Sequence, residues 1–269
     1  MERGGIFLVF ALLFFLQGIL ADQIIIQPNS TDGKDTYIQE DDNTMVSGTV
    51  TNLDIGQWWI NSAKRGLLEF NLSGIPSGKT IDRAILTLYM YNAGAGAGTN
   101  TNISAHKVVH SWIEGTSGYT DNGANWFTYN GTANWVITGG DFTSQVEAFN
   151  ITNSIGYYSW NITNLVRGWY NSSYINYGVL LKGVDEDSDL NLRKRFRSSD
   201  WSTVSERPQL IINYSNQSTD EISPLIDFTI GTETNNPYKS QNWIFINVTV
   251  NESNEDIIVF SLYNITTII

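Results

Sequence analysis

Cysteine is absent from the 269-residue chain, so no thiol is available as a catalytic nucleophile. Small exported domains of eukaryotes commonly depend on disulfides. A chain of this length can bury an adequate hydrophobic core without them. For an exported protein, the absence of cysteine therefore favours a bacterial or archaeal surface.

Positive charge is also scarce. The chain has 15 Lys and Arg against 27 Asp and Glu, which gives a net charge of −12 and a pI of about 4.5. Nucleic-acid binding requires clustered Lys and Arg against the phosphates, so this composition excludes nucleic acid as a partner. An acidic exported chain suits divalent cations, neutral or basic glycans, or high salt.

The common catalytic motifs are missing as well. The two histidines, His106 and His110, enclose two valines that favour a strand, and the glutamate of a zinc-protease helix is absent. Neither a Gly-x-Ser-x-Gly elbow nor a phosphate-binding loop occurs. Acidic side chains that could form a glycosidase pair exist, but none lies in a recognisable motif; they are Glu69, Asp82, Glu114, Asp141 and Glu147. We expect no catalysis by this chain, although a catalytic domain could belong to a longer product of the gene.

Long apolar runs are limited to residues 6–16, which follow Arg3 and precede the small residues Gly18 and Ala21. A membrane-spanning helix needs roughly 20 apolar residues. The pattern therefore predicts a signal peptide over residues 1–21, with an uncleaved anchor as the alternative. Either interpretation predicts export to the extracellular space or the cell surface.

Glycosylation sequons, Asn-x-Ser/Thr, recur along the chain without proline in the middle. Some arise by chance in a chain rich in Asn and Thr, but their density is typical of a surface glycoprotein. Together with the absence of cysteine, they favour an archaeal source. The candidate acceptors are Asn71, Asn102, Asn130, Asn150 and Asn171.

Short strand patterns separated by turn residues dominate the chain after the leader. Strands are predicted at 67–72, 81–91, 103–110, 157–160, 178–182 and 209–214, and one helix at 163–170 with Thr163 as its cap. This predicts an all-β protein with one short helix, and we expect a jelly-roll-like β-sandwich. A parallel β-helix is the rival, but no constant repeat length supports it.

The domain organisation follows from a polar stretch without strand pattern at 215–224, which we interpret as a linker. It separates a sandwich domain at 22–214 from residues 225–269. The latter contain too few strand patterns to close a sandwich. We interpret them as an incomplete, immunoglobulin-like β domain.

Aromatic residues gather in a stretch rich in Gly and Asn. Sugar rings stack on aromatic faces while amides bond their hydroxyl groups. The candidate carbohydrate-binding residues are Trp112, Trp126, Tyr129, Trp135 and Asn125. The alternative is that these tryptophans close one end of the core. Trp58 and Trp59 would point to opposite faces if they lay in a strand.

Asp185, Asp187 and Asp189 are spaced two residues apart, as the first acidic ligands of a calcium-binding loop are. The loop is not an EF-hand, because Leu190 replaces its glycine and Phe196 its closing glutamate. A structural calcium ion is one interpretation and a solvated acidic loop is the other. A second, weaker acidic group comprises Asp32, Asp35, Asp41 and Asp42.

Ordered motifs spread over the first domain carry a family resemblance. They are DTYI at 35–38, RGLLEFNLSGIP at 65–76, IDRAIL at 81–86, WIEG at 112–115, GGD at 139–141, ITNLVRGW at 162–169, YGVLLKG at 177–183, FRSS at 196–199 and RPQL at 207–210, with Trp126 and Trp135. This set resembles the DNRLRE domain, also grouped with carbohydrate-binding module family 96. The FRSS motif departs from the family, which often has an acidic residue directly after the first serine. Residues from Pro224 onward resemble the immunoglobulin-like repeats of archaeal surface-layer proteins.

The resemblance implies a β-sandwich of archaeal or bacterial extracellular proteins, often found beside polysaccharide-degrading domains such as those of disaggregatases. We therefore expect a non-catalytic carbohydrate-binding or adhesion module whose partner is a polysaccharide or glycoconjugate of the cell envelope. The first alternative is a surface-layer or filament subunit that self-assembles. The second is an accessory domain of a polysaccharide-degrading enzyme.

Overall fold

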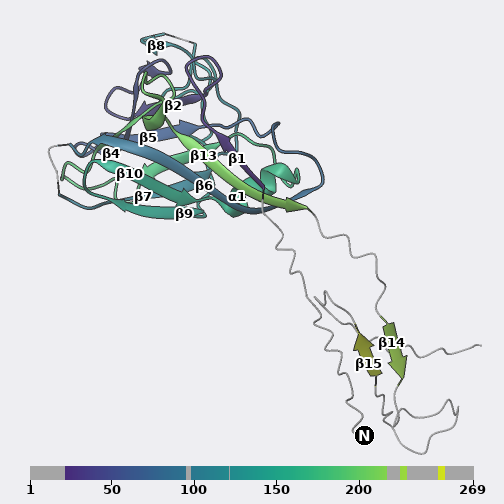
Figure 1. Ribbon diagram of the computed structural model, residues 1–269. Coiled ribbons are helices and arrows are strands. Elements are labelled where there is room, and N and C mark those ends of the chain that lie inside the picture. Colours follow the sequence, from purple (N-terminus) through teal and green to yellow (C-terminus); the bar gives the residue numbers. More distant parts are fainter. Residues whose placement is uncertain (1–21, 95–97, 121, 217–224, 229–247, 252–269) are drawn as a thin grey trace, which may run out of the picture. The chain divides into compact units, whose positions relative to one another are not determined.

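The computed structural model describes residues 22–94, 98–120, 122–216, 225–228 and 248–251 (Figure 1). The chain divides into two compact units, residues 1–216 and residues 217–269. The predicted signal peptide, most of the predicted linker and most of the predicted second domain lie outside the described residues.

The described part of the first unit consists of strands with one α-helix and one 3-10 helix. The elements are β1 (Asp22–Ile26), β2 (Asp35–Gln39), β3 (Val46–Ser47), β4 (Asn52–Gln57), β5 (Ala63–Leu68), β6 (Lys79–Asn92), β7 (Thr101–Lys107), β8 (Ser117–Gly118), β9 (Ala148–Thr152), β10 (Gly156–Asn161), α1 (Thr163–Tyr170), β11 (Val179–Gly183), β12 (Lys194–Arg197), η1 (Val204–Glu206) and β13 (Gln209–Asn216). The predicted all-β class and sandwich-like arrangement are confirmed.

The strands form an antiparallel sheet that curls over on itself. Hydrogen bonding runs in the order β1-β13-β6-β12-β4-β5-β11-β7-β9, with β10 added beside β6 and β2 beside β5. β4 joins the two halves, because Asn52–Ile55 pairs with β12 whereas Gly56 and Gln57 pair with β5. Gly56 has a φ of +100°, and a Cβ there would lie 2.6 Å from the Leu192 carbonyl oxygen, so the bend requires glycine.

The main core fills the space between the two halves of the curled sheet. Along β6, the buried side chains of Ala84, Leu86, Leu88 and Met90 alternate with outward-facing neighbours, as a strand with one covered face requires. The indole of Trp160 on β10 is fully buried and donates a hydrogen bond to the carbonyl of Ile103 on β7, at 2.9 Å. That bond ties one half of the sheet to the other.

The predicted helix at 163–170 is confirmed as α1, but its predicted cap is wrong. Ile162 occupies the N-cap position without a side-chain hydrogen bond. The Thr163 hydroxyl instead accepts a hydrogen bond from the Ala84 amide and donates one to Asn161 Oδ1. The helix start is therefore held by the neighbouring strands. The strand predicted at 67–72 is also displaced, because β5 begins at Ala63 and ends at Leu68.

A second hydrophobic cluster lies on the outer face of the curled sheet. Residues 108–147, here called the cap loop, connect β7 to β9 with little regular structure in their described part. Their buried tryptophans pack against Ile38 of β2, Leu67 of β5 and Leu180 of β11. This outer cluster anchors the cap loop, since its apolar side chains cover a sheet face that would otherwise meet water.

The described part of the second unit contains β14 (Leu225–Phe228) and β15 (Val248–Asn251), which pair antiparallel. The immunoglobulin-like assignment stays a prediction. Within the described residues, we find no helix with the length and apolar character that crossing a membrane requires.

Candidate functional site

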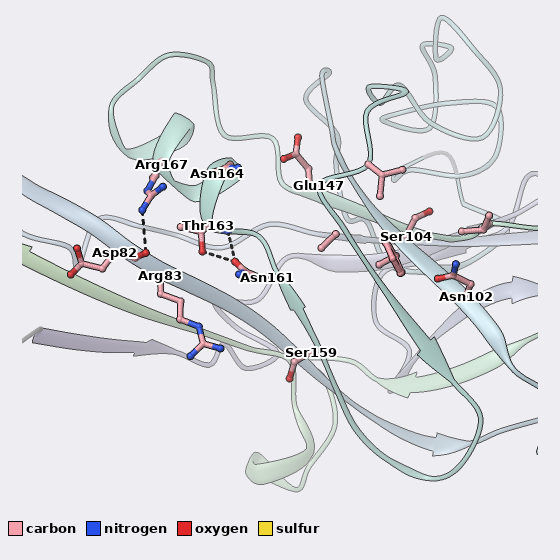
Figure 2. A pocket seen from close by; sticks show the side chains of 14 residues that line it. Asp82, Arg83, Asn102, Ser104, Glu147, Ser159, Asn161, Thr163, Asn164 and Arg167 are labelled. Carbon is pink, nitrogen blue, oxygen red and sulfur yellow. Dashed lines mark hydrogen bonds between the residues drawn. The ribbon is translucent and has the colours of Figure 1, made fainter. Parts of the chain in front are cut away.

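A hollow of about 1100 Å³ opens on the surface of the first unit, and is here called the groove (Figure 2). Its lining comes from β6, β7, β9, β10, the first turns of α1 and adjoining loop residues. The lining residues are Asp82, Arg83, Asn102, Ser104, Val146, Glu147, Ala148, Phe149, Ser159, Asn161, Thr163, Asn164, Arg167 and Val184. Most of these side chains are polar, and more than half of the lining residues belong to strands, which position binding groups more rigidly than loops do.

Hydrogen bonds to neighbouring backbone fix one wall of the groove. The Arg167 guanidinium donates to the carbonyls of Ile81 and Asp82, at 2.7 and 3.1 Å. Asn161 Oδ1 accepts from both the amide and the hydroxyl of Thr163. These groups are held in place before any ligand arrives, which reduces the ordering cost of binding.

Two other lining residues, Phe149 and Arg83, are exposed. Phe149 on β9 is 65% exposed, and its apolar side chain would gain free energy if a ligand covered it. Asn102 Oδ1 is buried and has no hydrogen-bond partner. Arg83 makes no ion pair within the described residues. The groove thus offers an apolar ring beside amides, hydroxyls and a guanidinium.

The charges of the groove balance, with Asp82 and Glu147 opposing Arg83 and Arg167. Burial raises the pKa of Glu147, and the charge of Lys107 partly opposes this shift. A ligand of strong net charge would gain little from such a surface. Its polarity suits a neutral molecule with many hydroxyl groups.

The tryptophans predicted to bind sugar lie elsewhere, in the outer cluster under the cap loop. Trp112, Trp126 and Trp135 are all buried, and Tyr129 is half-buried against them. They are brought together, as the sequence predicted. Their rings, however, are occupied by protein contacts, and they form a hydrophobic cluster of their own rather than one end of the main core.

Several polar atoms of this cluster are hydrogen-bonded within the protein. The indole nitrogens of Trp112 and Trp135 donate to the carbonyls of Tyr177 and Asn125, both at 2.9 Å. Asn125 Oδ1 accepts from the amides of Phe127 and Thr128. The Asn125 side chain therefore shapes a turn of the cap loop.

The acidic loop predicted to bind calcium does not bring its carboxylates together in a ligand-like group among the described residues. Asp185 Oδ1 accepts the amide of Asp187, which closes a local turn. Glu186, between them, instead forms a two-bond ion pair with Arg65, at 3.0 and 2.7 Å. Asp189 is exposed.

The second acidic group is also dispersed. Asp41 pairs with Lys64 at 2.9 Å, Asp42 accepts the hydroxyl of Tyr119, and Asp32 accepts the amide of Asn29. Asp35 alone faces other carboxylates.

Asp35, Glu114 and Asp200 form the one converging group of acidic or histidine side chains among the described residues, here called the carboxylate trio. One oxygen of each lies within 4.8 Å of the others. Glu114 Oε1 accepts the amide of Asp35 at 2.8 Å, and Asp35 Oδ2 accepts the amide of Ser199 at 2.8 Å. Asp35 Oδ1 and the Ser199 hydroxyl are buried and make no well-formed hydrogen bond within the described part of the chain, although the hydroxyl is near enough to lower the Asp35 pKa.

The surroundings of the carboxylate trio disfavour ionisation of all three carboxyl groups at once. Burial raises the pKa of Asp35 to about 7, and the charges of Glu114 and Asp200 add to the effect. Burial likewise raises the pKa of Glu114 to about 7 and shifts that of Asp200 upward. The sequence did not predict that Glu114 and Asp200 lie beside Asp35, although Glu114 belongs to the motif at 112–115 and Asp200 directly follows the motif at 196–199.

His106 and the tryptophan pair Trp58–Trp59 lie outside the groove. His106 on β7 is buried, with Nδ1 near the carbonyls of Thr143 and Gln145, and burial lowers its pKa. Trp58 and Trp59 lie in the turn after β4 rather than in a strand, and both are exposed.

The candidate glycosylation sites differ in accessibility. Asn71 and Asn171 are exposed in turns, and Asn130 is half-buried in the cap loop. Asn102 lines the groove. The amide nitrogen of Asn150, to which a glycan would be attached, donates a hydrogen bond to the Ser159 carbonyl at 2.9 Å.

A known family matches most of the first unit. Residues 35–212 match the family described as the disaggregatase related repeat domain. The matched segment spans β2 to β13 and contains both the groove and the carboxylate trio. No curated protein matches the chain. The resemblance to the DNRLRE domain covers the same region and stays a prediction.

Proposed function

The chain belongs to the disaggregatase-related repeat family, a family of surface or extracellular repeat domains, and from this premise we propose that it is a non-catalytic glycan-binding module that holds its ligand in the groove. The partner would be a polysaccharide or glycoconjugate of the cell envelope. The archaeal source, export by the predicted signal peptide and glycosylation belong to the same proposal.

The observation that carries this proposal is the combination of groups in the groove. Phe149 supplies an exposed ring on which the C–H face of a sugar can stack, since aromatic rings attract polarised C–H groups. The exposed side chains of Asn161 and Arg83 supply an amide nitrogen and a guanidinium that can donate to hydroxyl groups. The groove volume of about 1100 Å³ accommodates several sugar units rather than one small ligand.

The proposed site is tested by a glycan array followed by calorimetry with the best ligand. We expect Phe149→Ala to weaken binding about fivefold to tenfold, which corresponds to about 1–1.4 kcal/mol for one stacking contact. Phe127→Ala is the matched control, because it removes the same side chain from a partly exposed position in the cap loop. Trp59→Ala is the second control. Binding lost in Trp59→Ala but kept in Phe149→Ala would place the glycan elsewhere.

The proposal includes the absence of catalysis by this chain. A glycosidase needs two carboxyl groups that flank one bond. The groove carboxylates, Asp82 and Glu147, come from separate elements and point away from one another in Figure 2. Asp82 Oδ1 also accepts a hydrogen bond from Ser215. Release of reducing ends from an envelope polysaccharide by the purified chain would refute this part.

A structural role in the envelope is the second candidate, and the repeat character of the family favours it. A repeat domain can act as one unit of an array. This candidate predicts self-association, with a mass that rises with protein concentration in sedimentation experiments. A chain that stays monomeric at high concentration, with and without calcium, would contradict it. The accessory-domain hypothesis requires a catalytic domain in the same gene product, which its complete reading frame would reveal.

A further inference from the structure

The carboxylate trio joins three parts of the chain that are distant in sequence. Asp35 begins β2, Glu114 belongs to the cap loop, and Asp200 lies in the turn after β12. The outer cluster already anchors the cap loop through its tryptophans. A link at Glu114 would attach the same loop at a second, polar point.

Among the described residues, no Lys or Arg forms an ion pair with the trio that would balance its charge. Lys34 is the positive charge that faces Glu114, but its Nζ pairs with Glu69 at 2.6 Å and lies over the Trp112 ring. Arg207 faces Asp200, but its Nε donates to the Trp201 carbonyl at 2.6 Å. Carboxylates removed from water are costly unless a partner of opposite charge is bound to them.

A buried oxygen without a partner points to what is missing. The Asp35 side chain is 3% exposed; its Oδ2 is bonded to the Ser199 amide, whereas its Oδ1 has no hydrogen-bond partner. The Ser199 hydroxyl beside it is also buried; it is near enough to lower the Asp35 pKa, but it makes no well-formed hydrogen bond within the described residues. Gly33 packs against this hydroxyl so closely that a Cβ would lie 2.2 Å from its oxygen. The chain is therefore closely packed on the Ser199 side, and the Asp35 Oδ1 is left as a buried carboxylate oxygen without a well-formed hydrogen bond among the described residues.

We propose that Asp35, Glu114 and Asp200 bind one divalent cation, calcium, which fastens the cap loop to β2 and to the turn after β12. Calcium binds oxygen ligands at about 2.3–2.6 Å, so two ligands of one ion lie at most about 5 Å apart. The separations within 4.8 Å satisfy this limit. The trio offers only oxygens, whereas zinc sites in proteins typically use His or Cys. Magnesium retains several waters in a strict octahedron, which a half-buried cluster accommodates poorly.

The test is calorimetric titration of calcium into the chain after treatment with a chelator. Wild type should bind one ion, and Glu114→Gln and Asp200→Asn should each weaken its affinity about tenfold or more, because each removes one charged ligand. Glutamine keeps an oxygen that can accept the Asp35 amide, so the Glu114→Gln fold should persist. Asp187→Asn, in the acidic loop, is the matched control and should bind calcium like wild type.

Thermal denaturation provides the second readout. Calcium should raise the melting temperature of wild type and Asp187→Asn but not that of Glu114→Gln, and magnesium at equal concentration should raise it less. The inference is overturned if wild type binds no calcium and shows no shift. It is also overturned if Asp187→Asn, rather than Glu114→Gln, loses binding. Equal shifts with magnesium would remove the assignment to calcium. None of these outcomes depends on glycan binding.

Discussion

Replacement of Trp126 by alanine should unfold part of the population rather than remove a surface contact. The Trp126 side chain is 7% exposed, within the outer cluster, and the Arg65 guanidinium lies 4.7 Å from its ring centre. An aromatic side chain of this class buries about 150–250 Å², which at about 25 cal/mol per Å² gives an upper limit of about 4–6 kcal/mol. Trp→Ala changes in cores typically cost about 3–5 kcal/mol. We expect a loss in that range.

The assay is urea denaturation followed by far-ultraviolet circular dichroism. With a slope of about 2 kcal/mol per M, the Trp126→Ala midpoint should fall by about 1.5–2.5 M. Phe127→Ala, at the next position but 39% exposed, should change stability by less than about 1 kcal/mol. A Trp126→Ala loss below about 1 kcal/mol would refute the placement of the tryptophans in a packed cluster. Reduced glycan binding by this variant must be corrected for its unfolded fraction.

Three further predictions concern stability. Gly178→Ala should destabilise the fold by more than Gly78→Ala. Both glycines have positive φ, and alanine in this left-handed conformation costs about 1–2 kcal/mol, but at Gly178 the new Cβ would also lie 2.1 Å from a carbonyl oxygen. Equal losses of stability in denaturation experiments would contradict this prediction. A double-mutant cycle of Arg65→Met and Glu186→Gln should give a coupling of about 1–3 kcal/mol, and additive losses would show that the two-bond ion pair is not energetically linked. The pKa of His106 is lowered by burial, so its contribution is present above its ordinary pKa of about 6.5 and is lost as pH falls below it. His106→Gln should therefore lose less stability than wild type between pH 7 and pH 5, and parallel pH profiles would argue against a buried neutral imidazole.

Local patterns predicted the elements that local physics determines. The spacing of Leu165, Val166 and Trp169 predicted α1, and the structure buries all three side chains. The alternation after Ile85 predicted the central strand β6, with one face in the core. The cap at Thr163 was not predictable, because its hydroxyl is bonded to Ala84 on a distant strand.

Binding sites depended on long-range contacts that no short pattern contains. The tryptophans of the cap loop form a cluster as expected, but only the sheet under them decides that their rings are buried. The carboxylate trio joins residues that lie far apart in the sequence, and its bond between Asp35 and Glu114 spans 79 residues. The acidic loop at 185–189 has a more regular spacing of carboxylates, but its Glu186 forms an ion pair with Arg65 rather than a metal site.

The groove is tested most directly by nuclear magnetic resonance of the isotopically labelled chain, titrated with the envelope glycan that binds best on an array. The account predicts that backbone shifts concentrate at residues 82–83, 147–149 and 159–164, and that Phe149→Ala weakens these changes while Phe127→Ala leaves them intact. Shifts confined to the turn at Trp58 and Trp59, or no saturable shifts with any glycan, would contradict glycan binding in the groove.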